Sequence, residues 1–405
     1  LPYEAFFSLD AIVRTLWRMV ATRRNLLEWN PSSEAGRELP GVTRSALTAS
    51  FQAMWIGPAI AVAAGGYLIV ANPAALVVAG PLLCLWLVAP ALAWWVSRPL
   101  VRRAATLSAS QTLFLRALAR RTWAFFDHFV GPEDHWLPPD NYQEYRVAAV
   151  AHRTSPTNIG MALLANLAAH DFGYIVSGQL IERTRNTLRT LDSLERYRGH
   201  FYNWYDTQTL QPLPPLYIST VDSGNLAGHL LTLRAGLHAL ADDPILPRRF
   251  FEGLHDTFSL CLESGDPVTD DLLAGFGQHL AAARAAPIQG LAEAYRAIGC
   301  LATRAAGLDD AVVGDESKAW VTAVKRQVQA AREELEFLAP WLLLPTPSDR
   351  PGEMLGGGIP TLRQLAGLDE FSAPEAAIGR DRARERIALI DGLVRQAGEQ
   401  ARMDY

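Results

Sequence analysis

The chain has 405 residues, of which 49% are hydrophobic and 20% are charged, and its formal net charge is −5. This acidic balance, with no Lys/Arg run interleaved with aromatic residues in the charged part of the chain, argues against a nucleic-acid-binding protein. The three cysteines, Cys84, Cys261 and Cys300, are too widely spaced to predict a disulfide framework or a CxxC metal site.

Residues 1–50 begin with a basic amphipathic stretch. Between Tyr3 and Trp29, apolar residues recur at helical spacing with arginines between them: Phe7, Ile12, Leu16 and Val20 alternate with Arg14, Arg18, Arg23 and Arg24. Next to a membrane span, such a segment is typical of a helix that lies in the membrane interface. A surface helix of a preceding domain explains the pattern equally well, so both interpretations stay open.

The next region, 51–98, predicts a transmembrane helical hairpin. The 46 residues from Phe51 to Val96 contain no Asp, Glu, Lys, Arg or His. About 20 apolar residues cross the ~30 Å hydrocarbon core of a bilayer, so this run is long enough for two passes. Asn72 and Pro73 favour a turn, because proline has no N–H for a continuing helix. We therefore expect spans at 54–70 and 74–96, with a buried hairpin of a globular core as the alternative.

Positive charges flank this hairpin on both sides. Trp94 and Trp95 occupy the place of an interfacial aromatic belt, and arginines precede the first span and follow the second: Arg37 and Arg44, then Arg98, Arg102 and Arg103. Since the turn carries no charge, the distribution of arginines predicts that both flanks are cytoplasmic. The expectation is a multi-pass membrane protein with its soluble domain in the cytoplasm.

Residues 107–405 show helical periodicity throughout, which predicts an all-α domain. The clearest stripe is Leu226, Leu230, Leu233, Leu237 and Leu240. Further apolar faces are expected on one helix from Leu115, Leu118, Phe125 and Phe129, and on another from Ile181, Leu188, Leu191 and Leu194. The predicted helices cover 108–129, 159–170, 177–197, 246–262, 270–286, 288–306, 315–338 and 374–403, and Ser372 opens the last with a capping-box spacing. The glycines at 356–358 are interpreted as a flexible connector, with a lid as the alternative.

Two loops between these helices concentrate aromatic and polar residues. Flat aromatic rings can cover the apolar faces of sugar rings, while amides and carboxylates bind hydroxyl groups, so the loops predict a carbohydrate site. The candidate substrate-binding residues are Trp136, Asp140, Asn141, Arg153, Thr154, Asn158, His200, Tyr202, Asn203, Trp204, Asp206, Asp222 and Asn225. Structural alternatives remain: Thr157, Asn158 or Asp222 as helix N-caps, Tyr202 and Trp204 as core, and Arg153 as a loop tie to a carboxylate.

These same segments resemble the middle portion of the bacterial cyclic β-1,2-glucan synthases. The resemblance rests on the hairpin and on the stretches LPYEAFFSLDAIVRTLWRM, DHWLPPDNYQEY, AHRTSPTNIGMALLANLAAHDFGYI, RYRGHFYNWYD and ISTVDSGNLAGHLLTLR. It implies a glucoamylase-like, partial (α/α)6 barrel over 107–405. In the family, a membrane glycosyltransferase makes linear β-1,2-glucan from UDP-glucose, and the glucoamylase-like domain closes it into a ring by transglycosylation.

The resemblance also implies a retaining mechanism, with two carboxyl groups about 5 Å apart and a glucan hydroxyl as acceptor. The family's essential glutamates are expected beyond residue 405, so the chain alone is expected to be an inactive part of a glycosyltransferase/transglycosylase. Its implied partners are the β-1,2-glucan chain, the lipid bilayer, and glycosyltransferase and phosphorylase-like domains of the same polypeptide, with no nucleic acid. No metal and no cofactor are expected in this region; UDP-glucose and a divalent metal belong to the glycosyltransferase domain.

Two rival functions remain at this point. A membrane-tethered β-1,2-glucan hydrolase would share the fold and differ only in admitting water at the acceptor position. A non-catalytic module that organises a neighbouring transferase belongs to a different functional class. Among the acidic residues of the loops, Asp140, Asp206 and Asp222 are the ones expected to face sugar, and none is assigned as the nucleophile.

Overall fold

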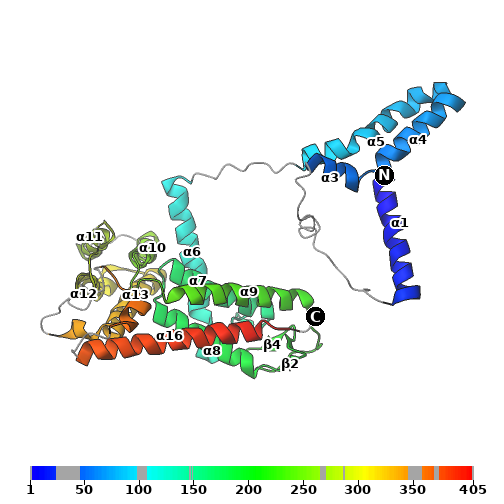
Figure 1. Cartoon of the computed structure of the whole chain (residues 1–405). Helices are drawn as coiled ribbons and strands as arrows, with labels where there is room; N and C mark the ends of the chain where they lie inside the picture. The colour runs from blue at the N-terminus through cyan, green and yellow to red at the C-terminus, as the bar shows by residue number, and fades with distance from the viewer. Residues whose placement is uncertain are drawn as a thin grey trace. The chain divides into compact units, whose positions relative to one another are not determined.

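The computed structural model describes residues 2–23, 46–97, 107–145, 147, 149–264, 271–285, 288–344, 358–368 and 374–403, and the backbone is helical in most of them (Figure 1). The chain divides into two compact units, Leu1–Thr106 and Leu107–Tyr405. The flanking arginines that predict the orientation, Arg37, Arg44, Arg98, Arg102 and Arg103, lie outside the described residues, as do Arg24, Trp29, Ser372 and the glycines at 356 and 357.

The first unit starts with α1 (Pro2–Trp17), which continues into a π-helical turn over Arg18–Thr22. Its apolar side chains are exposed, Phe7 by 62% and Trp17 by 66%, and Arg14 pairs with Asp10 over 2.8 Å. Within this unit, α1 contacts α4, where the rings of Phe6 and Trp55 meet edge to face at 6.0 Å. The described part of the predicted basic stretch is therefore helical, and its place at a membrane interface stays a prediction.

The apolar region forms α3 (Ala46–Ala53), α4 (Ile56–Ala71), a 3-10 turn over Pro73–Ala75 and α5 (Leu76–Val96), and α4 and α5 pack together. The predicted turn at Asn72 and Pro73 is confirmed. Only one helix among the described residues, Pro73–Val96, is by itself long and apolar enough to cross a membrane, with a hydropathy of 2.3. A second crossing requires α3 and α4 to act as one span, although they are bent by 68°.

The first predicted span, 54–70, begins before α4 does, because the helix is interrupted at residues 54 and 55, just before Pro58. Proline cannot donate to the carbonyl four residues earlier, and the Met54 carbonyl accepts from the Gly57 amide at 3.3 Å instead. Alone, the 16 residues of α4 extend about 24 Å at ~1.5 Å per residue, which is less than the ~30 Å of a bilayer core. The two-pass hairpin thus stays a prediction.

The second unit is built of helices with two short antiparallel ribbons. Its helices are α6 (Ala109–Phe129), α7 (Pro156–Asp171), α8 (Ser177–Ser193), α9 (Thr220–Leu240), α10 (Arg249–Ser264), α11 (Asp271–Ala285), α12 (Leu291–Ala305), α13 (Asp315–Leu338), α15 (Leu362–Ala366) and α16 (Pro374–Gln400), with 3-10 turns at Pro132–Asp134, Leu308–Ala311 and Pro340–Leu343. The strand β1 (Arg153–Thr154) pairs with β4 (Tyr205–Asp206), and β2 (Arg196–Tyr197) pairs with β3 (His200–Phe201).

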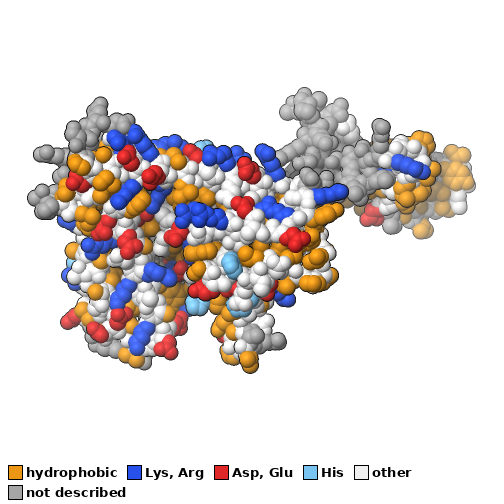
Figure 2. Space-filling view, turned by 90° about the horizontal axis from the view of Figure 1, so that it is seen from below, with side chains coloured by type: hydrophobic (Ala, Val, Ile, Leu, Met, Phe, Trp, Pro, Cys, Tyr) orange, Lys and Arg blue, Asp and Glu red, His pale blue; other side chains and the backbone are white. Residues whose placement is uncertain are grey.

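The core of this unit lies between helices that pack as pairs. Helix α9 packs on α7 and on α16, and Figure 1 shows α9 and α16 side by side, while α10 packs on α13 and α6. The predicted leucine stripe of α9 is buried from Leu226 to Leu240, and so are Ile181, Leu188, Leu191 and Leu194. Acidic and basic side chains are mixed over the visible face of the unit (Figure 2), as expected for a surface in water. The prediction of a mostly helical domain is confirmed; the (α/α)6 barrel stays a prediction.

Two helix predictions are wrong in detail. On α6, the expected core residues Leu115 and Leu118 are 46% and 50% exposed, whereas Arg120 and Trp123 are buried. Arg120 turns inward because its Nε donates to the Thr257 hydroxyl at 2.8 Å, which no apolar pattern encodes. The predicted helix 177–197 ends at Ser193, and Arg196 and Tyr197 belong to a ribbon.

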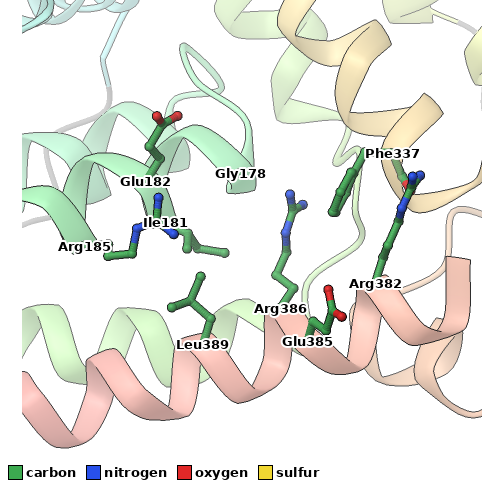
Figure 3. Close-up of a pocket in the computed structure, with 9 residues that line it drawn as sticks. All are labelled: Gly178, Ile181, Glu182, Arg185, Phe337, Arg382, Glu385, Arg386 and Leu389. Carbon is green, nitrogen blue, oxygen red and sulfur yellow. The ribbon is translucent and has the colours of Figure 1, made fainter. Parts of the chain in front are cut away.

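A buried carboxylate, Glu334 of α13, joins three helices. It accepts hydrogen bonds from the Ser177 hydroxyl at 2.5 Å and the Gly178 amide at 3.1 Å, both at the start of α8, and it pairs with Arg386 of α16. The side chains of Glu334 and Arg386 are 5% and 13% exposed. Figure 3 shows Arg386 extending from α16 towards Gly178 beside a pocket of about 240 Å³. This interaction fixes α8 against α13 and α16.

Replacing this carboxylate tests its contribution to stability. We expect Glu334→Gln to lower the free energy of unfolding by about 3 kcal/mol, because it leaves the Arg386 guanidinium buried without a countercharge. Chemical denaturation of the chain in micelles, followed by circular dichroism, measures the change. The matched control is Glu333→Gln, an exposed neighbour that accepts a hydrogen bond from Gln329 in its own helix. Equal unfolding midpoints for the two variants would contradict the assignment.

Candidate functional site

The two aromatic and polar loops meet where α7 and α9 begin. Ser155 caps α7 by accepting from the Asn158 amide at 3.2 Å, and Ser219 caps α9 by accepting from the Asp222 amide at 3.1 Å. The alternatives that Thr157, Asn158 or Asp222 provide these caps are therefore wrong. Because serines perform the capping, the side chains of all three residues remain for other hydrogen bonds.

One carboxylate in this region, Asp140, is bound by the first loop itself. Its Oδ2 accepts from Arg153 Nη2 at 2.9 Å, Arg153 Nε at 3.2 Å and Asn141 Nδ2 at 3.0 Å. Its Oδ1 accepts from Asn158 Nδ2 at 3.4 Å. Arg153 therefore does tie the loop to a carboxylate, as one alternative had it, but its side chain is 52% exposed and still accessible to a ligand.

A second carboxylate, Asp222, links the two helix starts. Thr157 donates its hydroxyl to Asp222 Oδ1 at 2.6 Å and accepts from Asn225 Nδ2 at 3.1 Å. The favoured orientation of the Asn203 amide points its nitrogen at Asp222. In this orientation the Asn203 nitrogen donates to Asp222 Oδ2 at 3.0 Å. The Asn203 oxygen then accepts from the Trp204 indole N–H at 2.7 Å and the Tyr217 hydroxyl at 2.6 Å.

The hydrogen-bonded residues around Asp140 and those around Asp222 are connected through Arg153 and Trp204. The guanidinium carbon of Arg153 lies 4.9 Å from the centroid of the Trp204 ring, close enough for a cation–π interaction. The pairing of β1 with β4, with Arg153 opposite Asp206, holds the two loops at this distance. We call the connected set the loop network: Asp140, Asn141, Arg153, Thr157, Asn158, Asn203, Trp204, Tyr217, Asp222 and Asn225.

Asp206 has a local role at the end of β4. Its Oδ1 accepts from the amides of Gln208 and Thr209 at 3.0 and 2.7 Å, and from the Thr209 hydroxyl at 3.0 Å. These hydrogen bonds hold the pKa of the Asp206 carboxyl below its ordinary value, with the Thr209 amide making the largest contribution. The carboxylate is ionised at neutral pH, and one of its oxygens is committed to the turn.

Three other predicted site residues lie deeper in the domain. His200 is buried, with its Nδ1 3.0 Å from the Ser223 hydroxyl. Thr154 is fully buried, and its hydroxyl lacks a hydrogen-bond partner among the atoms of the described residues. The half-buried Tyr202 packs against the core, and its amide donates to the Tyr205 hydroxyl at 2.8 Å. These contacts support the backbone of the loops.

Trp136 lies beside α8 instead of with Trp204. The guanidinium of Arg183 lies 5.6 Å from its ring centroid and 5.1 Å from that of Trp123. The Trp136 carbonyl accepts from the Thr187 hydroxyl at 3.1 Å. Within the described part of the chain, no hydrogen bond or ring contact joins this tryptophan to the loop network, so the two are close in sequence but do not pack together.

Sequence reasoning missed Thr157 and Tyr217 as network members, and it missed a neighbouring cluster around Asp134. The Asp134 Oδ1 lies 2.8 Å from His152 Nδ1 and accepts from the Thr207 hydroxyl at 2.5 Å. The position of Thr157 between two predicted site residues was a usable signal, whereas nothing in the sequence relates Asp134 to Thr207. No group of three or more His, Cys, Asp or Glu side chains suited to a metal ion occurs among the described residues.

No protein-family model matches the chain. A solved structure from Bacteroides fragilis NCTC 9343, of a protein assigned as a glucoamylase, aligns with 40% of this chain and 38% of its own at 18% identity; its TM-score of 0.29 assigns no fold.

The cyclic β-(1,2)-glucan synthase NdvB of Rhizobium meliloti (strain 1021) is 34% identical over 273 residues. The match covers 67% of this chain and 10% of that protein, so the chain spans about a tenth of the length of this relative. At this identity over two thirds of the chain, the resemblance drawn from the motifs is confirmed: the chain belongs to the cyclic β-(1,2)-glucan synthase family.

Proposed function

We propose that the chain is the part of a cyclic β-1,2-glucan synthase that links the enzyme to the membrane and binds glucan for cyclisation by retaining transglycosylation. The observation that carries the proposal is the 34% identity to a synthase of this name over two thirds of the chain. The loop network supports it independently, since it combines an aromatic ring, two carboxylates and several amides on one surface of the helical unit.

In this proposal, the loop network binds a glucan chain. Asp140 and Asp222 present carboxylate oxygens as hydrogen-bond acceptors, and Asn141 and Asn225 add amide groups. The half-buried Trp204 provides a flat ring for the apolar face of a glucose unit, with Arg153 stacked against it. Hydrogen bonds hold each of these side chains in place before glucan arrives, which reduces the entropy lost on binding.

The network carboxylates are assigned to binding and not to nucleophilic attack. Asp140 is paired with Arg153, and Asp222 accepts from Thr157 and, in the favoured amide orientation, from Asn203. A carboxylate with hydrogen bonds to both oxygens is a weaker nucleophile and keeps a fixed orientation. The proposed reaction proceeds through a covalent glycosyl intermediate that a glucan hydroxyl, in place of water, resolves. The catalytic pair itself is not assigned to residues of this chain.

The membrane part of the proposal places the protein in the bacterial inner membrane. Helix α5 would cross the bilayer, with the bent pair α3 and α4 as the second crossing, and α1 would lie in the interface with its exposed apolar face in lipid. Both ends of the hairpin, and hence the helical unit, would be cytoplasmic. UDP-glucose and a divalent metal would serve a glycosyltransferase domain of the same polypeptide, and a phosphorylase-like domain would be a further partner.

Substitution of Trp204 tests glucan binding. We expect Trp204→Ala to weaken binding of linear β-1,2-glucan about tenfold, if a stacked ring contributes ~1.4 kcal/mol. The unfolding free energy should change little, since the ring is half-buried and its removal leaves no sealed cavity. Titration calorimetry and chemical denaturation of the chain in micelles measure the two effects. The control Trp341→Ala removes a ring that is 3% exposed and should cost about 3–5 kcal/mol of stability.

Asp222 is tested separately with Asp222→Asn. The helix cap belongs to Ser219, so this substitution leaves the cap intact, removes the charge and converts one of the two acceptor oxygens into an NH2 donor. We expect about fivefold weaker glucan binding, as for loss of a charge-assisted hydrogen bond of ~1 kcal/mol, with an unchanged melting temperature. If Trp204→Ala unfolds the domain while Asp222→Asn binds glucan normally, the loop network is structural and the proposed site is wrong.

The topology is tested by cysteine labelling. Ser33→Cys and Ser108→Cys, each in a background with Cys84→Ala and Cys300→Ala, should be protected from an impermeant maleimide added to intact cells and react after permeabilisation. Cys261 can remain, because its thiol is buried and burial raises its pKa to about 11. Labelling of one position from outside and of the other only after permeabilisation would rule out two crossings between residues 33 and 108.

A further inference from the structure

A cleft separate from the loop network lies between α6 and α13. Its volume is about 570 Å³, and charged and aromatic side chains line it, among them Arg120, Asp127, His128, Glu316, Trp320 and Arg326. The six residues come from two helices that are nearly 200 positions apart in the chain. None of them belongs to the glucan-binding proposal.

Arg120 is the unusual member of this cleft. The residue is only 3% exposed, and its guanidinium carbon lies 5.1 Å from the Trp320 ring centroid and 5.3 Å from that of Tyr174. Its Nε donates to the Thr257 hydroxyl, but its Nη1 is buried without a hydrogen-bond partner. A buried N–H of a charged group that lacks an acceptor is strongly disfavoured.

The carboxylates near Arg120 are paired with other arginines. Asp127 pairs with Arg326, Glu316 with Arg121 at 2.9 Å, and Asp256 with Arg116 at 2.8 Å. Across the described ranges, no ion pair to Arg120 is found. Burial lowers the pKa of the Arg120 guanidinium to about 10, so it is still a cation at neutral pH. The cleft therefore contains a buried positive charge without a carboxylate of its own.

We propose that this cleft binds a small oxyanion, a phosphate or carboxylate group, with Arg120 as its principal ligand and Arg326 at the entrance. Arginine recognises these groups through paired N–H donors, and a buried site strengthens the interaction. A sugar suits the cleft less well than the loop network, since the Trp320 ring is covered by the guanidinium groups of Arg120 and Arg121, the latter at 5.9 Å.

A bound water is the competing explanation for the unpartnered Nη1. A smaller cavity of about 20 Å³ adjoins Arg120 and is also lined by Gln179 and Gln327. That volume holds one water molecule, which could accept from the guanidinium. The two explanations differ in one consequence: a water leaves the charge unneutralised and predicts no saturable binding of anions in the larger cleft.

Calorimetric titration of the 405-residue chain in micelles distinguishes them. Inorganic phosphate and citrate are titrated separately in a Tris–chloride buffer free of other oxyanions. We expect saturable binding of at least one. Arg120→Met should weaken it at least about tenfold through loss of charge-assisted hydrogen bonds. Asp127→Asn should tighten it about threefold, because it removes a negative charge from the cleft and releases Arg326. The control Arg332→Gln breaks an ion pair with Glu336 on α13, outside the cleft, and should bind like the unmodified chain.

Every outcome of this titration either supports the proposed oxyanion site or overturns it. Saturable binding of phosphate, of citrate or of both supports the site and identifies the oxyanion that it prefers. Absence of saturable binding, or equal affinity in Arg120→Met, overturns it in favour of the water. If Arg120→Met does not fold, Asp127→Asn and Arg326→Gln carry the test, with tighter and weaker binding expected respectively. Unchanged affinity in both of these variants also overturns the proposal.

Discussion

The helical unit depends on a carboxylate removed from water, Glu334, which accepts from Ser177, Gly178 and Arg386 at once. A Cβ on Gly178 would lie 2.6 Å from the Glu334 Oε2, so a larger residue at this position would displace the carboxylate. The position of α8 then sets that of Arg183, whose guanidinium donates to the Phe126 and Val130 carbonyls at 2.9 and 3.2 Å. These hydrogen bonds hold the end of α6, from which the first loop departs. A buried ion pair on one side of the unit thereby positions a loop of the proposed glucan site.

The second loop is held by the close packing of α7 on α9. A Cβ at Gly160 would lie 2.3 Å from the His229 Nδ1, and one at Gly236 would lie 2.5 Å from a Leu167 methyl. Two glycines therefore let the helices approach closely. At their N-termini, this approach brings Thr157 within 2.6 Å of Asp222, and the partial positive charge of a helix start favours carboxylates there. The network is a consequence of helix packing, and the loops complete it.

Features that repeat locally along the chain could be predicted from the sequence. The leucines of α9 recur at helical spacing and are buried, and Asn72 with Pro73 ends α4 as expected. The partners of charged groups could not be predicted in this way. Thr157 and Asp222 are 65 positions apart, and Arg120 and Thr257 are 137 apart, so neither pair has a local signature. The composition of the loops indicated a polar site, but which aspartate is bound by which partner depends on the tertiary structure.

Arginine stacked on tryptophan occurs in both proposed sites, and burial gives the two pairs different chemistry. Arg153, over Trp204, is half exposed and paired with Asp140, so its charge is compensated and screened by water. Such a pair provides a flat surface with hydrogen-bonding edges, which suits an uncharged sugar. Arg120, over Trp320, is almost completely buried and has an unpartnered N–H. In low-dielectric surroundings its charge interacts more strongly with an anion. The same two residue types thus favour a neutral ligand at the surface and an anion in the cleft.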